Sequence, residues 1–367
     1  MLKGGIIMTK NQYKNERKTS HGNGRDVITQ NGKDMSKNQK LPDIKEVEKF
    51  VLQSIFGQDK QVRQIITSIY RSINFKTIKS NILIVGNSGT GKTETIKQIA
   101  KKLNIPYTIE DATKYTQEGY YGADVEDMIY NLIENANRNI EKAQNGIIVI
   151  DEIDKKAGNE EHDVAGTEVL KSLLKIIEGT IIQIPSLDDP FSEELINFDT
   201  KNIIIIFLGA FSGLEKIREK RLNSNPLGFT KTNVEKKEIQ KSPFSKNDLI
   251  EYGMPKEFVG RIDTIIEMNK LTKQNLSLIL KKSKLSIFRR YQTELKQKGV
   301  LLSYNGKLFE CIAEKSLTID TGARELSNTV NYMFENIVYD ILANPNKFKK
   351  CTLNLDIVND NTKYELS

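Results

Sequence analysis

The sequence predicts an α/β protein in which a parallel sheet flanked by helices is followed by a smaller, mainly helical domain. Three apolar runs, Ile82–Val85, Gly146–Ile150 and Ile203–Leu208, are continuous instead of alternating. Continuous runs are typical of parallel strands that are buried on both faces. Amphipathic helical spacing separates these runs, and after about residue 268 it replaces them. We therefore expect a large domain over residues 46–267 and a small domain over residues 268–367.

The remaining elements follow from the same periodicities. In the large domain we expect a short strand at Tyr107–Ile109 and helices at Val47–Ile55, Val62–Ile73, Lys92–Leu103, Val125–Asn139 and Val169–Glu178. The clearest elements of the small domain are helices at Leu276–Lys296 and Arg324–Leu342 and a terminal strand near Thr352–Val358. The segment Leu222–Lys246 carries Asn, Pro, Gly and Lys without periodicity, which predicts an exposed loop.

Residues 1–45 are expected to form a basic, disordered tail, because they contain hardly any apolar periodicity. They hold ten Lys and Arg against four Asp and Glu, whereas the rest of the chain is close to neutral. Such a tail is more often solvated than bound, so nucleic acid is not expected as a partner. The codons of Lys3-Gly4-Gly5 can resemble a ribosome-binding site, and we hypothesise that Met8 is the true start. An intact mass that includes residues 1–7 would reject this.

Composition also excludes several classes of protein. No apolar run approaches the roughly 20 residues that cross a bilayer, and the N-terminus lacks the apolar core of a secretion signal. We therefore expect a cytoplasmic protein without a membrane partner. Only two cysteines (Cys311 and Cys351) and two histidines (His21 and His162) are present. These numbers argue against a structural zinc site, a disulfide framework or a Ser-His-Asp hydrolase.

The strand Ile82–Val85 runs directly into a glycine-rich segment that predicts a nucleotide site. Backbone N–H groups of such a loop surround phosphates, and the following helix N-terminus adds partial positive charge. Lys92 is placed to reach the β- and γ-phosphates, and the Thr93 hydroxyl is placed to bind Mg²⁺. A chance glycine-rich loop is the alternative, and the complete pattern makes it a poor one. The predicted nucleotide-binding residues are Gly86, Asn87, Ser88, Gly89, Thr90, Gly91, Lys92 and Thr93.

The strand Gly146–Ile150 ends in two acids that complete this site. Carboxyl ends of parallel strands meet at one edge of the sheet, so Asp151 and Glu152 are expected beside the phosphate loop. Asp151 is then placed to hold Mg²⁺, and Glu152 to polarise a water for attack on the γ-phosphate. Acids at strand ends often only cap a helix, but together with the loop they predict hydrolysis of ATP.

In this order the motifs resemble the AAA+ unfoldases of the ClpX type, with HslU a near neighbour. The resemblance covers roughly residues 46–350 and implies a P-loop ATPase domain followed by a small α-rich domain. Phe56 and Gly57 resemble the segment on the adenine side of the family's site. Arg261 resembles the arginine finger that reaches the γ-phosphate of a neighbouring subunit, and Arg324 resembles the second sensor. The resemblance therefore implies catalytic roles for Glu152, Arg261 and Arg324.

Two further segments resemble the loops that line the family's central pore. Tyr120 and Tyr121, flanked by Gly119 and Gly122, offer an aromatic surface to an extended polypeptide. Tyr121 stands where a smaller aliphatic residue is expected, which predicts a bulkier pore. His162 takes the place of the basic residue of the second pore loop. The alternative is a tyrosine-rich turn that packs on its own domain.

The segment Leu227-Gly228-Phe229 resembles the tripeptide with which ClpX docks onto its peptidase. Apolar residues at the tip of an exposed loop suit insertion into a hydrophobic cleft of a partner. The alternative is that the tripeptide packs back on the large domain. A ClpP-type peptidase is therefore the peptidase partner that the resemblance implies.

The sequence departs from ClpX at several points. We expect no cysteine-rich zinc-binding N-domain like that of ClpX, since the sequence shows none, and no polar side chain stands at the first-sensor position near Phe207-Leu208-Gly209. Where ClpX has a basic pore-entrance loop, Ile181–Thr200 carries Asp188, Asp189, Glu193 and Glu194. An acidic entrance should disfavour substrates presented by a free C-terminal carboxylate, which predicts poor handling of the usual ribosome-rescue tag. Efficient degradation of a reporter with that tag would reject this.

The function that the resemblance implies is ATP-driven unfolding and threading of unfolded or tagged proteins by a homo-hexamer, with ATP and Mg²⁺ as cofactors. The chain itself has no protease constellation. Two alternatives stay open: a remodelling chaperone that works without a peptidase, and an AAA+ motor or loader for nucleic acid.

Overall fold

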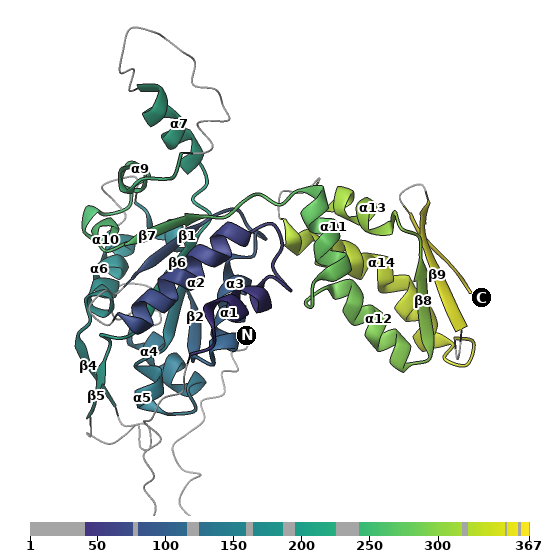
Figure 1. The fold of residues 1–367 in the computed structure, drawn as a ribbon, viewed down its shortest axis with the longest axis horizontal. Helices are drawn as coiled ribbons and strands as arrows, with labels where there is room; N and C mark the ends of the chain where they lie inside the picture. The colour runs from purple at the N-terminus through teal and green to yellow at the C-terminus, as the bar shows by residue number, and fades with distance from the viewer. Residues whose placement is uncertain are drawn as a thin grey trace, which may run out of the picture. The chain divides into compact units, whose positions relative to one another are not determined.

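A five-stranded parallel sheet organises the first two thirds of the chain (Figure 1). Its strands are β1 (Ile82–Val85), β2 (Tyr107–Asp111), β3 (Ile147–Asp151), β6 (Ile204–Gly209) and β7 (Thr264–Glu267). Their order is β2-β3-β6-β1-β7, and every neighbouring pair is parallel. The predicted fold class is therefore confirmed. Only β6 separates β1 from β3, so the segments that follow these two strands emerge at the same edge of the sheet.

The structure is a computed structural model, and the sequence-based predictions for residues 119–122, 162 and 227–229 lie outside the part that it describes. The described residues are 41–75, 80–115, 125–158, 164–185, 195–224, 242–317, 322–348, 351–358 and 361–366.

Side chains alternate along each strand and so supply two separate cores. From β1, Leu83 and Val85 join the core formed with α4 (Val125–Asn135), α6 (Val164–Glu178) and α10 (Lys256–Gly260). Ile82 and Ile84 join the core on the other face, formed with α1 (Ile44–Val51), α2 (Asp59–Asn74) and α3 (Lys92–Leu103). Because both faces are covered, every residue of β1 and β6 is buried, as the continuous apolar runs predicted.

Shorter elements surround this sheet. An antiparallel hairpin of β4 (Ile181–Pro185) and β5 (Leu195–Asp199) takes part of the segment expected to be an acidic loop. The four acids on which that expectation rested, at positions 188, 189, 193 and 194, lie outside the described part. The other elements are η1 (Ala112–Lys114), α5 (Ile140–Ala143), η2 (Ile153–Lys156), α7 (Leu214–Ser224) and α9 (Lys246–Glu251).

The C-terminal part has a hydrophobic core of its own. Helices α11 (Lys273–Lys282), α12 (Ile287–Gln297), α13 (Leu308–Leu317) and α14 (Ala323–Ala343) accompany a sheet of β8 (Val300–Tyr304), β9 (Cys351–Val358) and β10 (Asn361–Leu366). β8 pairs with β9 in parallel, and β10 pairs with β9 antiparallel. The two clusters around the large sheet contain no buried residue after Met268, and this third cluster begins at Leu276.

The expectation of one continuous helix over Leu276–Lys296 is wrong. The chain forms two helices, and the break falls at Ser283 and Ser286. The Ser283 hydroxyl donates to the Ser54 carbonyl at 3.0 Å and accepts the backbone N–H of Leu285 at 3.1 Å. The Ser286 hydroxyl donates to the Leu280 carbonyl at 2.6 Å and caps α12. Serine side chains that bond nearby backbone compete with helical hydrogen bonds, and here that competition ends α11.

Two smaller differences concern helix ends. Asp43 caps α1, so the first helix begins two residues before the expected domain boundary. The helix expected over Val125–Asn139 ends at Asn135, because Asn137 and Arg138 adopt positive φ angles of 55° and 61°. No helix in the described part of the chain is long and apolar enough to cross a membrane.

Candidate functional site

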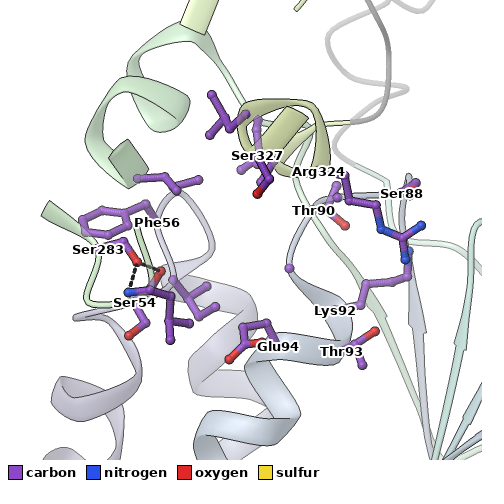
Figure 2. Close-up of a pocket in the computed structure, with 18 of the residues that line it drawn as sticks. Ser54, Phe56, Ser88, Thr90, Lys92, Thr93, Glu94, Ser283, Arg324 and Ser327 are labelled. Carbon is purple, nitrogen blue, oxygen red and sulfur yellow. Dashed lines mark hydrogen bonds between the residues drawn. The ribbon is translucent and has the colours of Figure 1, made fainter. Parts of the chain in front are cut away.

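One cavity of about 580 Å³ collects the phosphate loop, the end of β3 and residues of the small domain (Figure 2). Of the predicted nucleotide-binding residues, Phe56, Asp151, Glu152, Arg324 and the run Ser88–Thr93 line it. Gly57, Gly86 and Asn87 are not among its lining residues. The sequence thus predicted the parts of the cavity made by the loop and by the acids, and one residue on each of two other sides, Phe56 and Arg324.

The phosphate loop has the backbone conformation that its glycines permit. Gly89 and Gly91 adopt φ angles of 73° and 93°, which cost residues with a side chain much more. Lys92 lies at the start of α3, and its ammonium donates to the carbonyls of Gly86 and Asn87. Burial lowers the pKa of this ammonium, while the nearby Asp151 carboxylate opposes the shift. The negative charge of a bound phosphate would offset the effect of burial and favour the charged ammonium of Lys92.

Thr93 and the two acids at the end of β3 meet at the floor of the cavity. The Thr93 hydroxyl donates to Asp151 Oδ2 at 3.1 Å, as expected if both oxygens serve one cation. Glu152 is exposed and adopts φ 58° and ψ 31°, a left-handed conformation that is uncommon for a residue with a side chain. Its N–H donates to Asp151 Oδ1 at 2.9 Å. Backbone strain of this kind persists only where the surrounding structure enforces it, and it is most frequent at functional sites.

Asp154 is a site residue whose role the sequence did not reveal. It is 6% exposed, and its carboxylate accepts the backbone N–H groups of Ala210 at 3.3 Å and of Phe211 at 3.1 Å. Ala210 follows β6 and lines the cavity. Asp154 therefore ties the turn after the acids of β3 to the end of β6, where a first sensor was expected.

The small domain closes the cavity through the start of α14. Ala323 N donates to the Gly89 carbonyl at 3.1 Å, so this helix begins directly on the phosphate loop. A Cβ at Gly322 would lie 2.9 Å from the Ser88 carbonyl oxygen, which leaves room only for glycine. Figure 2 shows the Arg324 side chain extending toward Lys92, and its charge contributes to the lowered pKa of that lysine.

The apolar end of the cavity lies between the segment that joins α1 to α2 and the residues of α11 and the start of α12. Ile55 and Phe56 face it from the large domain, and the bond from Ser283 to Ser54 joins the two sides (Figure 2). Sequence reasoning missed the small-domain residues here, because their spacing also fits an ordinary helical core. These lining residues are Leu271, Ile279, Leu280, Ser283, Leu285, Ser286, Ile287, Arg290, Leu326 and Ser327.

Arg261 lies away from this cavity. It follows α10, its side chain is 54% exposed, and its guanidinium pairs with Glu178 at 2.5 Å. Glu178 is the last residue of α6. The predicted arginine finger is thus not brought to the phosphate loop of its own chain.

Together, a parallel sheet, a strand–loop–helix phosphate site, two acids at the end of β3 on the same edge of the sheet, and a small helical domain define an AAA-type ATPase. Comparison with known families agrees, because the AAA domain family (Cdc48 subfamily) matches residues 77–265.

Curated relatives then identify the branch. The chain is 34% identical to the ATP-dependent Clp protease ATP-binding subunit ClpX of Bacteroides thetaiotaomicron, over 86% of this chain and 81% of the relative. It is also 34% identical to ClpX of Treponema denticola, over 82% and 77%. ClpX 2 of Wolinella succinogenes is 36% identical, over 82% and 78%.

The chain belongs to the ClpX family of ATP-dependent Clp unfoldase subunits and is an AAA-domain ATPase. The predicted family, fold and enzyme class are confirmed. The residue roles remain predictions.

Proposed function

We propose that this chain is the motor subunit of a homo-hexameric ring that unfolds and threads unfolded or tagged proteins into a ClpP-type peptidase. Support comes from its relatives, which are named as ATP-binding subunits of an ATP-dependent Clp protease. The chain's own contribution is ATP hydrolysis, and cleavage of the threaded protein belongs to the partner.

The position of Arg261 is the observation that carries this proposal. The cavity is lined by three lysines, two arginines and four acids of this chain, but no residue of α10 lines it. Arg261 is instead exposed and held by one surface ion pair with Glu178, which is worth little in water. A cation that is easily released and faces solvent suits a site in a second subunit. We therefore assign Arg261 to the γ-phosphate that a neighbouring chain binds.

Within one chain, the cavity residues divide the work on the nucleotide. Phe56 and the apolar residues of α11 would hold the adenine, and the loop N–H groups with Lys92 would hold the phosphates. Glu152 is placed to orient the attacking water, since it lies next to Asp151 and is open to solvent. Arg324 would contact the phosphates from the small domain.

Mg²⁺ fits the pair of oxygens from Thr93 and Asp151. These two hard oxygen donors lie 3.1 Å apart, and such donors are what Mg²⁺ prefers. No group of three or more His, Cys, Asp or Glu side chains that would hold a metal occurs among the described residues. The remaining ligands would then be phosphate oxygens and water, which makes metal binding depend on the nucleotide. Mg²⁺ would neutralise charge on the β- and γ-phosphates.

The test is ATP hydrolysis by the purified chain, alone, with an unfolded protein, and with that protein plus ClpP. We expect stimulation by the unfolded protein and its degradation when ClpP is added. Glu152→Gln should bind ATP but hydrolyse it at least about 100-fold more slowly. Glu141→Gln, an exposed change on α5, is the matched control and should behave as the wild type.

The same assay separates the alternative functions. Stimulation by DNA and not by unfolded protein would replace the proposal with a nucleic-acid motor. Stimulation and unfolding without degradation in the presence of ClpP would indicate a remodelling chaperone. Deletion of residues 227–229 should abolish degradation and leave the ATPase intact if the peptidase docks there.

A further inference from the structure

A buried glutamine, Gln58, connects the phosphate loop with the segment that joins the two domains. It precedes α2, and its side chain is fully buried. Its amide nitrogen donates to the Thr90 carbonyl at 3.2 Å and to the Asn269 carbonyl at 2.9 Å. Its amide oxygen accepts the Asn269 N–H at 2.9 Å. Both amide hydrogens and one oxygen lone pair of Gln58 are therefore in use.

The segment on the other side of this contact is the exit from β7. Met268 N still donates to the Val85 carbonyl at 2.8 Å, in continuation of the sheet. Asn269 is the next residue, and the small domain begins with α11 four residues later. The Gln58 amide thus bonds both the N–H and the carbonyl of Asn269, as the backbone of a neighbouring strand would, at the point where the chain leaves the sheet.

Gln61 completes the contact but touches no part of the phosphate loop. Its amide donates to the Glu267 carbonyl at 3.0 Å and to Asn269 Oδ1 at 3.1 Å. The Asn269 side chain donates in turn to the Gly57 carbonyl at 2.8 Å and to Gln61 Oε1 at 3.3 Å. Gln58 and Gln61 are the same residue type three positions apart, yet of the two only Gln58 bonds Thr90.

The hydrogen bonds of Gln58 can respond to nucleotide because the cavity is shared by the two domains that they connect. Residues of both domains line it, so a bound nucleotide contacts both and biases how they are held. Thr90 belongs to the loop whose N–H groups would turn toward phosphates. Rotation of its peptide unit moves the Thr90 carbonyl, which accepts a hydrogen bond from Gln58. Both amide hydrogens of Gln58 are already used, so no spare donor can replace that bond. All three hydrogen bonds of the Gln58 side chain are made in this arrangement. When the Thr90 carbonyl moves, a switch of Asn269 to a second arrangement is therefore favoured over a gradual shift.

We propose that Gln58 is a positioning residue that transmits the nucleotide state of the phosphate loop to the interdomain segment at Asn269. The inference depends on the nucleotide site proposed above and deepens it. It assigns to one side chain the coupling between binding and movement of the small domain. The alternative is that Gln58 only stabilises the fold.

Two variants separate these roles, with a matched control. Gln58→Met keeps the length of the side chain and removes all three hydrogen bonds. Gln58→Glu keeps the acceptor for Asn269 N–H but cannot donate to Thr90, and it serves if the methionine variant does not fold. Gln61→Met makes the same chemical change in the same contact without touching the phosphate loop.

The measurement is the distance between a fluorescent donor and acceptor placed at Glu141 and Asn336, both exposed. Full-length chains with Cys311 and Cys351 replaced by serine carry the labels, and excess unlabelled chain dilutes them to one labelled subunit per assembly. Energy transfer is recorded without nucleotide, with ADP, and with a slowly hydrolysed ATP analogue. Affinity for the analogue is measured on the same samples.

We expect nucleotide to change the energy transfer in the wild type and in Gln61→Met. In the Gln58 variants this change should fall by at least about half, while affinity changes less than about threefold. An unchanged response in the Gln58 variants would overturn the inference, as would an equal loss in Gln61→Met. A wild type that binds nucleotide without any change would also overturn it. A wild type that binds no nucleotide would instead reject the proposed site.

Discussion

Replacement of Asp154 by alanine should both weaken the fold and slow hydrolysis. The carboxylate is 6% exposed and accepts two backbone N–H groups, from Ala210 at 3.3 Å and from Phe211 at 3.1 Å. Phe211 is 2% exposed and has a φ of 50°, so its N–H has little access to water and its backbone is held in an uncommon conformation. Without Asp154, nothing else among the described side chains is seen to bond these two groups.

The expected magnitude follows from these contacts. A hydrogen bond to a charged acceptor contributes about 1.5–3 kcal/mol, and both distances here are longer than the usual optimum. We therefore take the lower value for each bond, which gives a loss of about 3 kcal/mol for Asp154→Ala. For a domain of this size that corresponds to a fall in Tm of roughly 6–12 °C. Asp154→Asn keeps one acceptor oxygen and should lose about half as much.

Thermal and urea unfolding measure this loss, with Asp199→Ala as the control. Asp199 also accepts a backbone N–H, from Lys201 at 2.9 Å, but at an exposed turn. Its removal should cost under about 1 kcal/mol. Because Ala210 lines the cavity, Asp154→Ala should also lower kcat for ATP. Equal unfolding midpoints for the Asp154 and Asp199 variants would refute the reasoning.

Three further predictions concern the nucleotide site and its surroundings. Burial lowers the pKa of Lys92, so its ammonium loses its proton at a lower pH than that of an unperturbed lysine. As pH rises, nucleotide affinity should therefore begin to fall at a lower pH, and Lys92→Arg should flatten this profile in a binding titration. Gly322→Ala places a Cβ 2.9 Å from the Ser88 carbonyl oxygen, at a residue with a φ of 58°. ATP should therefore bind at least about tenfold more weakly, as measured by calorimetry. Unchanged affinity would count against contact between α14 and the loop. Tyr115 is buried and donates to Glu110 at 2.7 Å, so Tyr115→Phe should lower the unfolding free energy by about 1.5–3 kcal/mol, and urea unfolding without a shift would contradict it.

The fold of the large domain could be predicted because its strands are buried on both faces. Continuous apolar runs such as Ile203–Leu208 have few other interpretations. β7 was missed because Thr264–Glu267 is short and ends in an acid. The break between α11 and α12 was missed for a different reason. Ser283 and Ser286 lie within helical spacing, and only their tertiary and capping bonds show that the helix ends there.

The site could be predicted where backbone geometry alone places residues together. The loop after β1 and the acids after β3 share one edge in any parallel sheet of this order. The small-domain wall of the cavity depends on contacts across more than 200 positions, such as Ser283 with Ser54. Gln58 shows the same limit, because a glutamine before an amphipathic helix gives no sign of its partners Thr90 and Asn269.

A site shared between subunits is the central claim, and mixed assemblies of two inactive variants test it most directly. Glu152→Gln lacks the residue that orients water, and Arg261→Ala lacks the arginine proposed to act on the neighbour. When the two are co-expressed in equal amounts, about one quarter of the interfaces combine an intact Glu152 with an intact Arg261. We predict that ATPase activity returns to about a quarter of the wild-type value. Activity that stays at the level of the separate variants would contradict the account.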